Sequence, residues 1–217
     1  NGLLAIFHGC TLPRGWERMY PNYAGSEAVR ASENLIFGQY ECDQEAQAAT
    51  LHPFIRNAVG SMEFGGCFFN KRLSRSNQHG TIRRTTDAFQ IAISVLYQNP
   101  VQNFAITPNN LTDAPEVCID FMKEVPVLWD ETRYVSGCPG ESAVIARRNG
   151  RTWYVAAVNA IDKPLEINAK DVLEVLDASD ARAYVISGGN EPVKEKVDRK
   201  TKVSVPKNDG FVMIINL

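Results

Sequence analysis

Two glutamates, Glu27 and Glu33, stand six positions apart and follow a histidine at position 8. A pair of carboxyl groups can carry out acid/base chemistry, in which one donates a proton and the other acts as nucleophile or as base for a water molecule. The residues around the pair predict a helix over 27–37, with Ser26 as its N-cap. Six residues of a helix turn by about 600°, which leaves the two side chains roughly 120° apart. Both glutamates can therefore face one site only if Glu27 lies at or before the helix start; the alternative is a solvated helix face.

His8 directly follows the apolar run 3–7, and a loop rich in glycine, arginine and aromatic residues continues to about Gly25. An unbroken apolar run is typical of a strand that is buried on both faces, as in a parallel sheet. A buried strand that opens into a polar loop is how an α/β enzyme presents its active face. The alternative is a plain surface loop after a core strand.

The residue spacing in this stretch resembles the catalytic domain of glycoside hydrolase family 97. The positions that carry the resemblance are His8-Gly9, Pro13, Gly15, Arg18, Tyr20-Pro21-Asn22, Glu27, Arg30 and Glu33. A second match follows at 51–56 and 60–64, with Arg56 and Glu63 inside it. There the family usually has Leu-Pro-Phe-Thr-Arg and Gly-Pro-Met-Asp-Tyr, so this match is close but not identical.

The resemblance implies roles for the two glutamates. Glu33 matches the general acid of the family, which is the acid/base residue in its retaining members. Glu27 matches a ligand of a calcium ion, and Glu33 also contacts the metal under this interpretation. Ca²⁺ is a hard cation that takes six to eight oxygen ligands, so carboxylates suit it. At least one further ligand is expected from a part of the enzyme outside this chain.

The same resemblance implies a group of substrate-binding residues. His8 is expected to contact a sugar hydroxyl, and Arg14, Trp16 and Arg18 offer a stacking face and hydrogen-bond donors. Glu63 stands near the end of the next predicted strand, where it would reach the same site. The structural alternatives are a hydrogen-bonded core histidine for His8, packing under the loop for Trp16, and a buried pair with a basic neighbour for Glu63.

Gly9 departs from part of the family pattern. Inverting members carry a glutamate directly after the histidine and use it as base, which a glycine cannot replace. The resemblance therefore implies the retaining, α-galactosidase-like branch, whose nucleophile is an aspartate on an earlier barrel strand outside this chain. An α-glucosidase of the same family and a catalytically inactive carbohydrate-binding or structural fragment remain alternatives.

Composition limits the possible partners. The 217 residues carry a formal net charge of -2, so no electrostatic footprint for nucleic acid or an anionic membrane is present. No apolar run reaches the ~18–20 residues of a membrane span. The expected partners are an oligosaccharide or α-glycoside substrate and the missing N-terminal part of the same enzyme; an oligomer is possible. Five cysteines without metal-ligand spacing indicate mostly buried thiols. A periplasmic or extracellular location is inferred from the resemblance only.

The first part of the chain alternates between strand and helix patterns. After a connector at 41–44, helical residues are expected over 45–59, with an interruption at Pro53. Strands are expected at 61–64 and 102–107, and helices at 87–97 and 113–123. This alternation is typical of a parallel α/β fold. It supplies three of the eight strand–helix units of a (β/α)8 barrel, which needs about 250 residues.

The pattern changes after residue 125. Asn149-Gly150 separates two β-rich arms, 142–148 and 151–159, and predicts a hairpin with a type I′ turn. No helix is expected beyond residue 125. The predicted fold class is thus α/β plus all-β, with the C-terminal portion of a (β/α)8 catalytic barrel at 1–125 and a small antiparallel β-sandwich at 126–217.

Overall fold

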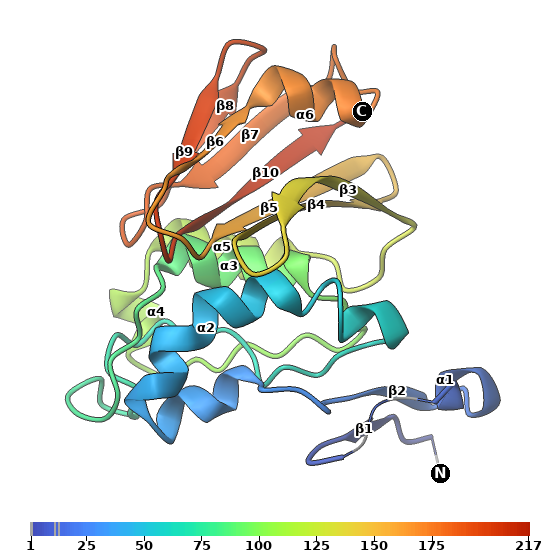
Figure 1. Cartoon of the computed structure of the whole chain (residues 1–217), viewed down its shortest axis with the longest axis vertical. Coiled ribbons are helices and arrows are strands. Elements are labelled where there is room, and N and C mark those ends of the chain that lie inside the picture. The colour runs from blue at the N-terminus through green and yellow to red at the C-terminus, as the bar shows by residue number, and fades with distance from the viewer. Residues whose placement is uncertain (1, 11, 13) are drawn as a thin grey trace.

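The protein folds into stacked layers (Figure 1). The computed structural model describes residues 2–10, 12 and 14–217. A six-stranded antiparallel sheet forms one layer, helices pack beneath it, and short parallel segments with the N-terminal arm lie furthest from the sheet. Two hydrophobic cores occupy the two faces of the sheet. The fold is therefore a mixture of helix and antiparallel sheet with a smaller parallel part.

The parallel part consists of four neighbouring segments. Strand β1 (Ala5–Phe7) pairs with β2 (Tyr23–Ser26), and single parallel bridges then join Ser26 to Met62 and Cys67 to Phe104. The predicted strands at 61–64 and 102–107 are wrong in extent, because each holds only an isolated bridge. Positive φ angles at three glycines (Gly60, Gly65 and Gly66) interrupt a regular ladder around the first of them.

The segment from β1 to the first helix differs from its prediction. Helix α1 (Trp16–Met19) and β2 lie within the stretch expected to be a loop. The helix predicted over 27–37 is wrong: Ser26 ends β2, and only the 3-10 turn η1 (Ser32–Ile36) is helical. The positive φ of 43° at Ala28 and the hydrogen bond from the Ser32 N–H to the Phe64 carbonyl oxygen, at 2.8 Å, hold the chain out of a helix. Glu27 consequently lies before the helical turn that carries Glu33, as a shared site requires.

The remaining helices follow the sequence signals more closely. Helix α2 (Gln39–Leu51) includes the expected connector, so the predicted start of the helical residues at 45 is wrong. The predicted interruption at Pro53 is confirmed, because α2 ends at Leu51 and the separate turn η2 (Asn57–Val59) follows. The start of the helix predicted over 87–97 is confirmed, because the Thr86 hydroxyl accepts a hydrogen bond from the Phe89 N–H at the N-terminus of α3 (Asp87–Leu96). Helix α4 (Asn110–Asp113) precedes α5 (Glu116–Glu124), so the helix predicted over 113–123 begins later than expected, directly after Pro115.

The C-terminal part is built on antiparallel strands, as predicted. The six-stranded sheet has the order β3 (Glu131–Cys138), β4 (Ser142–Asn149), β5 (Thr152–Asn159), β10 (Gly210–Asn216), β7 (Arg182–Ser187) and β8 (Val193–Val197). A two-stranded sheet of β6 (Leu165–Asn168) and β9 (Lys202–Val205) packs with helix α6 (Ala169–Val175) over one face. The expectation of no helix after residue 125 is wrong. Two turns with buried residues at 169, 172 and 173 suffice for α6, which is too short to stand out in a β-rich sequence.

The hairpin at Asn149-Gly150 forms with a different turn. Asn149 pairs with Thr152, so the two central residues are Gly150 and Arg151. Only Gly150 has a positive φ, 57°, whereas a type I′ turn needs a positive φ at both central positions. The turn therefore matches type II′, and the predicted type I′ is wrong although the antiparallel arms are confirmed.

Helix α3 is buried on every side between the sheet and the rest of the helical part. All ten of its residues are buried. The guanidinium of Arg147 on β4 donates from Nε to the Val95 carbonyl oxygen at 2.7 Å and from Nη2 to that of Leu96 at 3.0 Å. Burial lowers the pKa of Arg147 to about 10. The arginine thus satisfies carbonyls that the end of any helix leaves unpaired.

Two composition-based predictions can be compared with the structure. The cysteines are mostly removed from solvent, because Cys42, Cys67 and Cys118 are buried, Cys10 is partly buried and Cys138 alone is exposed. Among the described residues, no helix is both long and apolar enough to cross a bilayer.

We expect Arg147→Met to lower the free energy of unfolding by about 2–4 kcal/mol, because it leaves the buried carbonyls of Val95 and Leu96 without donors. Urea denaturation followed by circular dichroism measures the change. The matched control is Arg182→Met on β7, an exposed position that should change stability by less than about 0.5 kcal/mol. Equal effects of the two substitutions would contradict this role of Arg147.

Candidate active site

Three polar residues come together where neighbouring parallel segments end. β1 ends at Phe7 and is followed by His8, β2 ends at Ser26 and is followed by Glu27, and Glu63 follows the bridge at Met62. The carboxyl ends of parallel strands meet at one edge of a sheet, which is where α/β folds place their sites. The 3-10 turn η1 adds Glu33 to the same edge.

His8 bridges two carboxylates. Its Nδ1 lies 2.9 Å from Glu63 Oε2, and its Nε2 lies 2.8 Å from Glu33 Oε1. The hydrogen bond with Glu63 raises the pKa of His8 most strongly, and Glu33 and Glu27 raise it further against the opposing effect of burial. The protonated imidazole can donate to both carboxylates at once. About half of the His8 side chain remains exposed, so a ligand can reach it.

Glu27 lies beneath this bridge. It is buried, and its Oε2 accepts a hydrogen bond from the Gly9 N–H at 2.8 Å and lies 3.7 Å from His8 Nδ1. Burial raises the pKa of Glu27, while the Gly9 N–H and His8 oppose the shift. Gly9 has a φ of 57°, a conformation that favours glycine. The glycine therefore supplies a backbone donor to Glu27 in the position where inverting relatives are expected to carry a glutamate.

The backbone that carries Glu33 is fixed by the turn at 64–66. The Ser32 N–H and hydroxyl both donate to the Phe64 carbonyl oxygen, at 2.8 and 2.6 Å. A Cβ atom on Gly65 would lie 2.9 Å from the Glu33 nitrogen, so only glycine permits this approach. The Glu33 side chain itself is about one-third exposed, at 35%. Its carboxyl is thus placed by a rigid turn yet open to solvent.

Glu63 is buried and held on both sides. Its Oε1 accepts from the Gly65 N–H at 2.6 Å and from Asn103 Nδ2 at 3.4 Å, while Oε2 faces His8. This geometry matches the alternative of a buried pair with a basic neighbour. Glu63 therefore orients His8, and the predicted contact of Glu63 with substrate stays a prediction.

Arg56, in the second stretch that resembles the family, holds the backbone that carries Glu27. Arg56 is buried and donates from Nε to the Glu27 carbonyl oxygen at 2.9 Å and from Nη2 to that of Ser26 at 2.6 Å and that of Ser61 at 2.9 Å. The second sequence match contains Arg56 but predicts no role for it. Its planar set of donors joins two backbone segments at the site, the end of β2 and the stretch before Met62, which a lysine could not reproduce.

The structure does not bring Arg14, Trp16 and Arg18 into the cluster. The Trp16 ring packs against those of Phe7 and Tyr23, at centroid distances of 6.4 and 6.1 Å, and matches the packing alternative. Arg14 and Arg18 are exposed, and within the described part of the chain neither side chain forms a hydrogen bond or an ion pair. Their contacts with substrate stay predictions.

The side chains of the cluster offer some of the ligand atoms that a calcium ion prefers. One ligand atom each from His8, Glu27 and Glu33 lies within 4.8 Å of the other two. The two carboxylates fit a calcium ion, whereas an imidazole nitrogen is not among the oxygen ligands that this ion prefers. Both His8 nitrogens already face carboxylates. The fit therefore rests on Glu27 and Glu33, which could provide part of a coordination shell.

The C-terminal part matches a known family model. Residues 128–216 match the family described as "Glycosyl-hydrolase 97 C-terminal, oligomerisation". Two curated relatives match across both parts of the chain. A "Probable retaining alpha-galactosidase" from Streptomyces bingchenggensis is 35% identical over 198 residues, covering 87% of this chain and 29% of the relative. A "Retaining alpha-galactosidase" from Bacteroides thetaiotaomicron is 32% identical over 161 residues, covering 72% of this chain and 24% of the relative. The chain thus spans less than a third of either relative.

Solved structures show the same fold. A β-arabinopyranosidase is 56% identical, with a TM-score of 0.90, over 98% of this chain and 34% of that protein. A glycoside hydrolase family 97 enzyme from Pseudoalteromonas sp. strain K8, in complex with panose, is 21% identical with a TM-score of 0.76. The match covers 97% of this chain and 34% of that protein. The similarity covers both the parallel part and the antiparallel sheet.

We expect Arg56→Lys to loosen the backbone at residues 26–31, because one ammonium group cannot make all the hydrogen bonds of the guanidinium. The free energy of unfolding should fall by about 1–3 kcal/mol. Hydrogen exchange of peptides covering 26–31 should become faster. Arg75→Lys, at an exposed loop position, is the control; identical exchange in both variants would show that Arg56 does not hold this segment.

Proposed function

Because the chain belongs to glycoside hydrolase family 97, we propose that it forms the C-terminal part of a retaining glycosidase. The observation that carries the proposal is the convergence of Glu33, Glu27 and His8 at one edge of the parallel segments. A half-exposed histidine beside a carboxyl that is open to solvent is suited to bind a sugar and to transfer a proton to its glycosidic oxygen.

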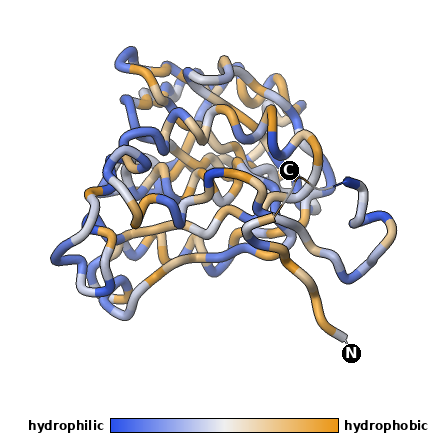
Figure 2. Tube along the Cα trace, turned by 60° about the horizontal axis from the view of Figure 1, so that its bottom comes forward, coloured by the Kyte–Doolittle hydropathy of each residue, from blue (hydrophilic) through white to orange (hydrophobic). Residues whose placement is uncertain are grey.

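The parallel segments are proposed to be the last strands of a (β/α)8 barrel. The N-terminal arm, which leaves the body of the molecule in Figure 2, bears large apolar side chains that are exposed: Leu3, Leu4, Leu12, Met19 and Tyr20. Contiguous exposed apolar surface marks a contact with another structure. The relatives are more than three times as long as the stretch they share with this chain. We propose that the preceding part of the enzyme supplies the other strands and covers this arm.

The chemistry follows from the positions of the cluster residues. In the first step the Glu33 carboxyl gives its proton to the glycosidic oxygen as the bond to the anomeric carbon breaks. His8 orients Glu33 through Nε2 and is itself held by Glu63. In the second step the Glu33 carboxylate takes a proton from the water that releases the sugar. The nucleophile is a carboxylate from the preceding part of the enzyme, so the 217-residue chain alone should show no turnover.

The substrate class is proposed to be α-D-galactosides or β-L-arabinopyranosides. These sugars share the configuration of the ring, since L-arabinopyranose is galactose without the C6 hydroxymethyl group. The 56% identity with a β-arabinopyranosidase favours the pentose, and the retaining α-galactosidases at 35% and 32% favour the hexose. Comparison of kcat/KM for the two p-nitrophenyl glycosides distinguishes them; a preference for the α-glucoside would favour the α-glucosidase alternative.

Retention is the first prediction for the full-length enzyme. Gly9 has no carboxylate that could activate a water molecule on the opposite face of the sugar. A carboxylate from the preceding part of the enzyme must therefore attack the anomeric carbon itself, and the two successive displacements restore the starting configuration. Proton NMR of a fresh digest of an α-galactoside should show the α-anomer before mutarotation. An initial β-anomer would contradict retention, and saturable binding without turnover would support an inactive carbohydrate-binding protein instead.

Glu33→Gln is expected to reduce hydrolysis of alkyl glycosides, which need protonation of the leaving group, by about 10²–10⁴-fold. Aryl glycosides with acidic leaving groups should lose much less in the step that forms the glycosyl-enzyme. Pre-steady-state kinetics of both substrate types in the full-length enzyme measure this difference. If that step slows equally for both, Glu33 is not the acid.

Calcium is proposed to bind Glu27 and Glu33, with further oxygen ligands from the preceding part of the enzyme. Such an ion supplies positive charge that can orient sugar hydroxyls beside the two carboxylates. A chelator should inactivate the full-length enzyme and calcium should restore it. Titration calorimetry should show weaker calcium binding in Glu27→Gln than in Glu17→Gln, a variant of an exposed glutamate on α1. Full activity in excess EDTA would count against the metal.

Two coarser proposals complete the assignment. The description of the matching C-terminal family includes oligomerisation, and we propose that the sheet-forming part of the chain takes part in an oligomer. A periplasmic or extracellular location stays a prediction from the family resemblance.

A further inference from the structure

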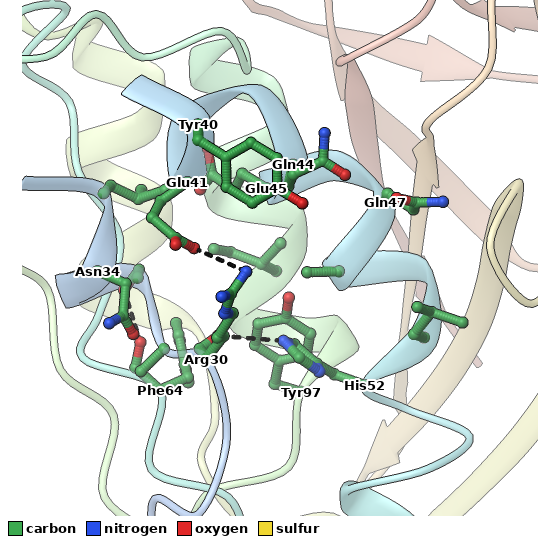
Figure 3. A pocket seen from close by; sticks show the side chains of 16 residues that line it. Arg30, Asn34, Tyr40, Glu41, Gln44, Glu45, Gln47, His52, Phe64 and Tyr97 are labelled. Atoms are coloured by element: carbon green, nitrogen blue, oxygen red, sulfur yellow. Dashed lines mark hydrogen bonds and ion pairs between the residues drawn. The ribbon is translucent and has the colours of Figure 1, made fainter. Parts of the chain in front are cut away.

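A separate cavity lies between η1, α2 and the end of α3 (Figure 3). Its volume is about 260 Å³, and its walls include none of His8, Glu27, Glu33 and Glu63. Phe64 and Tyr97 contribute aromatic walls, and their rings meet edge to face at 4.9 Å.

The hydroxyl of Tyr97 points into this cavity without a partner. Tyr97 is only 5% exposed, and Figure 3 shows its hydroxyl directed between Arg30 and α2. Throughout the described residues, no group forms a hydrogen bond with this hydroxyl. Burial raises the pKa of Tyr97, so the group is a neutral phenol that can donate and accept. The hydroxyl atom itself is open to the cavity, because Asn99 Oδ1 is the one fully buried side-chain N or O atom without a hydrogen bond among the described residues. A donor and acceptor that faces the cavity is available to a ligand.

The charged groups around the cavity are balanced. Arg30 Nη1 lies 3.3 Å from Glu41 Oε2, so these two charges pair at the wall. His52 holds its Nε2 at 3.2 Å from the Arg30 carbonyl oxygen, and burial lowers the pKa of His52 to about 4, which leaves it neutral at pH 7. Burial raises the pKa of Glu45, whose carboxylate oxygens accept from Thr85 and Gln90. A cavity whose charged groups are paired or hydrogen-bonded is suited to an uncharged ligand.

The other polar side chains that line the cavity favour a ligand with several hydroxyl groups. Asn34, Gln44 and Gln47 line the cavity, and within the described chain their amide groups make no hydrogen bond to other side chains or to the backbone. Amides that both donate and accept match sugar hydroxyls, and the rings of Phe64 and Tyr97 match the apolar face of a sugar. The volume lies slightly below the range of about 300–1,000 Å³ for drug-sized ligands, so one sugar ring is the appropriate size.

We propose that the cavity between η1 and α2 binds one neutral monosaccharide, of the size and class that the enzyme releases. The choice of a monosaccharide rests on the proposed function, whereas the existence of the site rests on the cavity and the unpartnered Tyr97 hydroxyl. Ser32 and Asn34 line the cavity on either side of Glu33 in the sequence. An occupant therefore packs against the backbone that positions Glu33.

The test is hydrogen exchange of the full-length protein, titrated with D-galactose and with L-arabinose. Peptides covering 40–52 report on the cavity, and peptides covering 26–31 report on the active site. We expect saturable protection of 40–52 by at least one of the sugars. Tyr97→Phe removes only the hydroxyl and should raise the half-maximal concentration about fivefold, the effect of one lost hydrogen bond. Tyr184→Phe, at a partly buried tyrosine of the distant strand β7, is the matched control and should have no effect.

Ala48→Leu, at a wall position of α2, provides a second variant because the larger side chain fills the cavity while the helix is retained. It should abolish the protection of 40–52. The proposal is overturned if neither sugar protects 40–52 up to about 100 mM, or if Tyr97→Phe and Ala48→Leu both bind as the wild type does. Glycosidase activity, measured in parallel, separates the two proposals: an active enzyme without this protection refutes only the cavity site.

Discussion

The complete burial of helix α3 is the constraint on which the rest of the structure depends. One side of this helix packs against β5 and β10, and the approach is so close that a Cβ atom on Gly210 would lie 3.1 Å from the Phe89 Cα atom and 3.2 Å from the Ala92 Cβ atom. Its core includes residues of the sheet, of the helices and of the parallel segments together. A helix without a solvated side can form only when both layers are present, so α3 couples them.

The polar groups around α3 extend this coupling toward the site. Gln90, which is fully buried on α3, donates to Glu45 on α2 and accepts from the Phe68 N–H through its side-chain oxygen. One side chain of α3 thereby binds both α2 and the backbone at Phe68. Arg56 makes a similar connection closer to the cluster, where it joins the ends of the segments that carry Glu27 and Glu63. Buried polar groups that are fully paired specify one arrangement, because any other leaves them without partners.

The cluster brings several acidic side chains close together around one histidine. Three carboxylates, Glu27, Glu33 and Glu63, surround one imidazole, and the pKa of His8 rises because its proton is shared between acceptors. The N–H groups of Gly9 and Gly65 each donate to one of these carboxylates. The carboxyl groups outnumber the single imidazole, which makes a further cation such as the proposed calcium physically reasonable. Both glycines have a positive φ, and a Cβ atom on Gly65 would lie 2.9 Å from the Glu33 nitrogen, so the two backbone donors occupy positions that favour glycine.

The sequence by itself determined the elements whose signals are local. The capping hydroxyl of Thr86, the proline before α5 and the glycine of the β4–β5 hairpin each act within a few residues, so their elements were predictable. The spacing of His8, Glu27 and Glu33 also singled out, through the family resemblance, three side chains that the structure brings together. Only the tertiary structure decided the rest. Residues 27–31 stay out of a helix because Ser32 bonds to the distant Phe64, and Glu63 faces His8 because two parallel segments end together. Such contacts join residues that are far apart in the chain, and no local pattern encodes them.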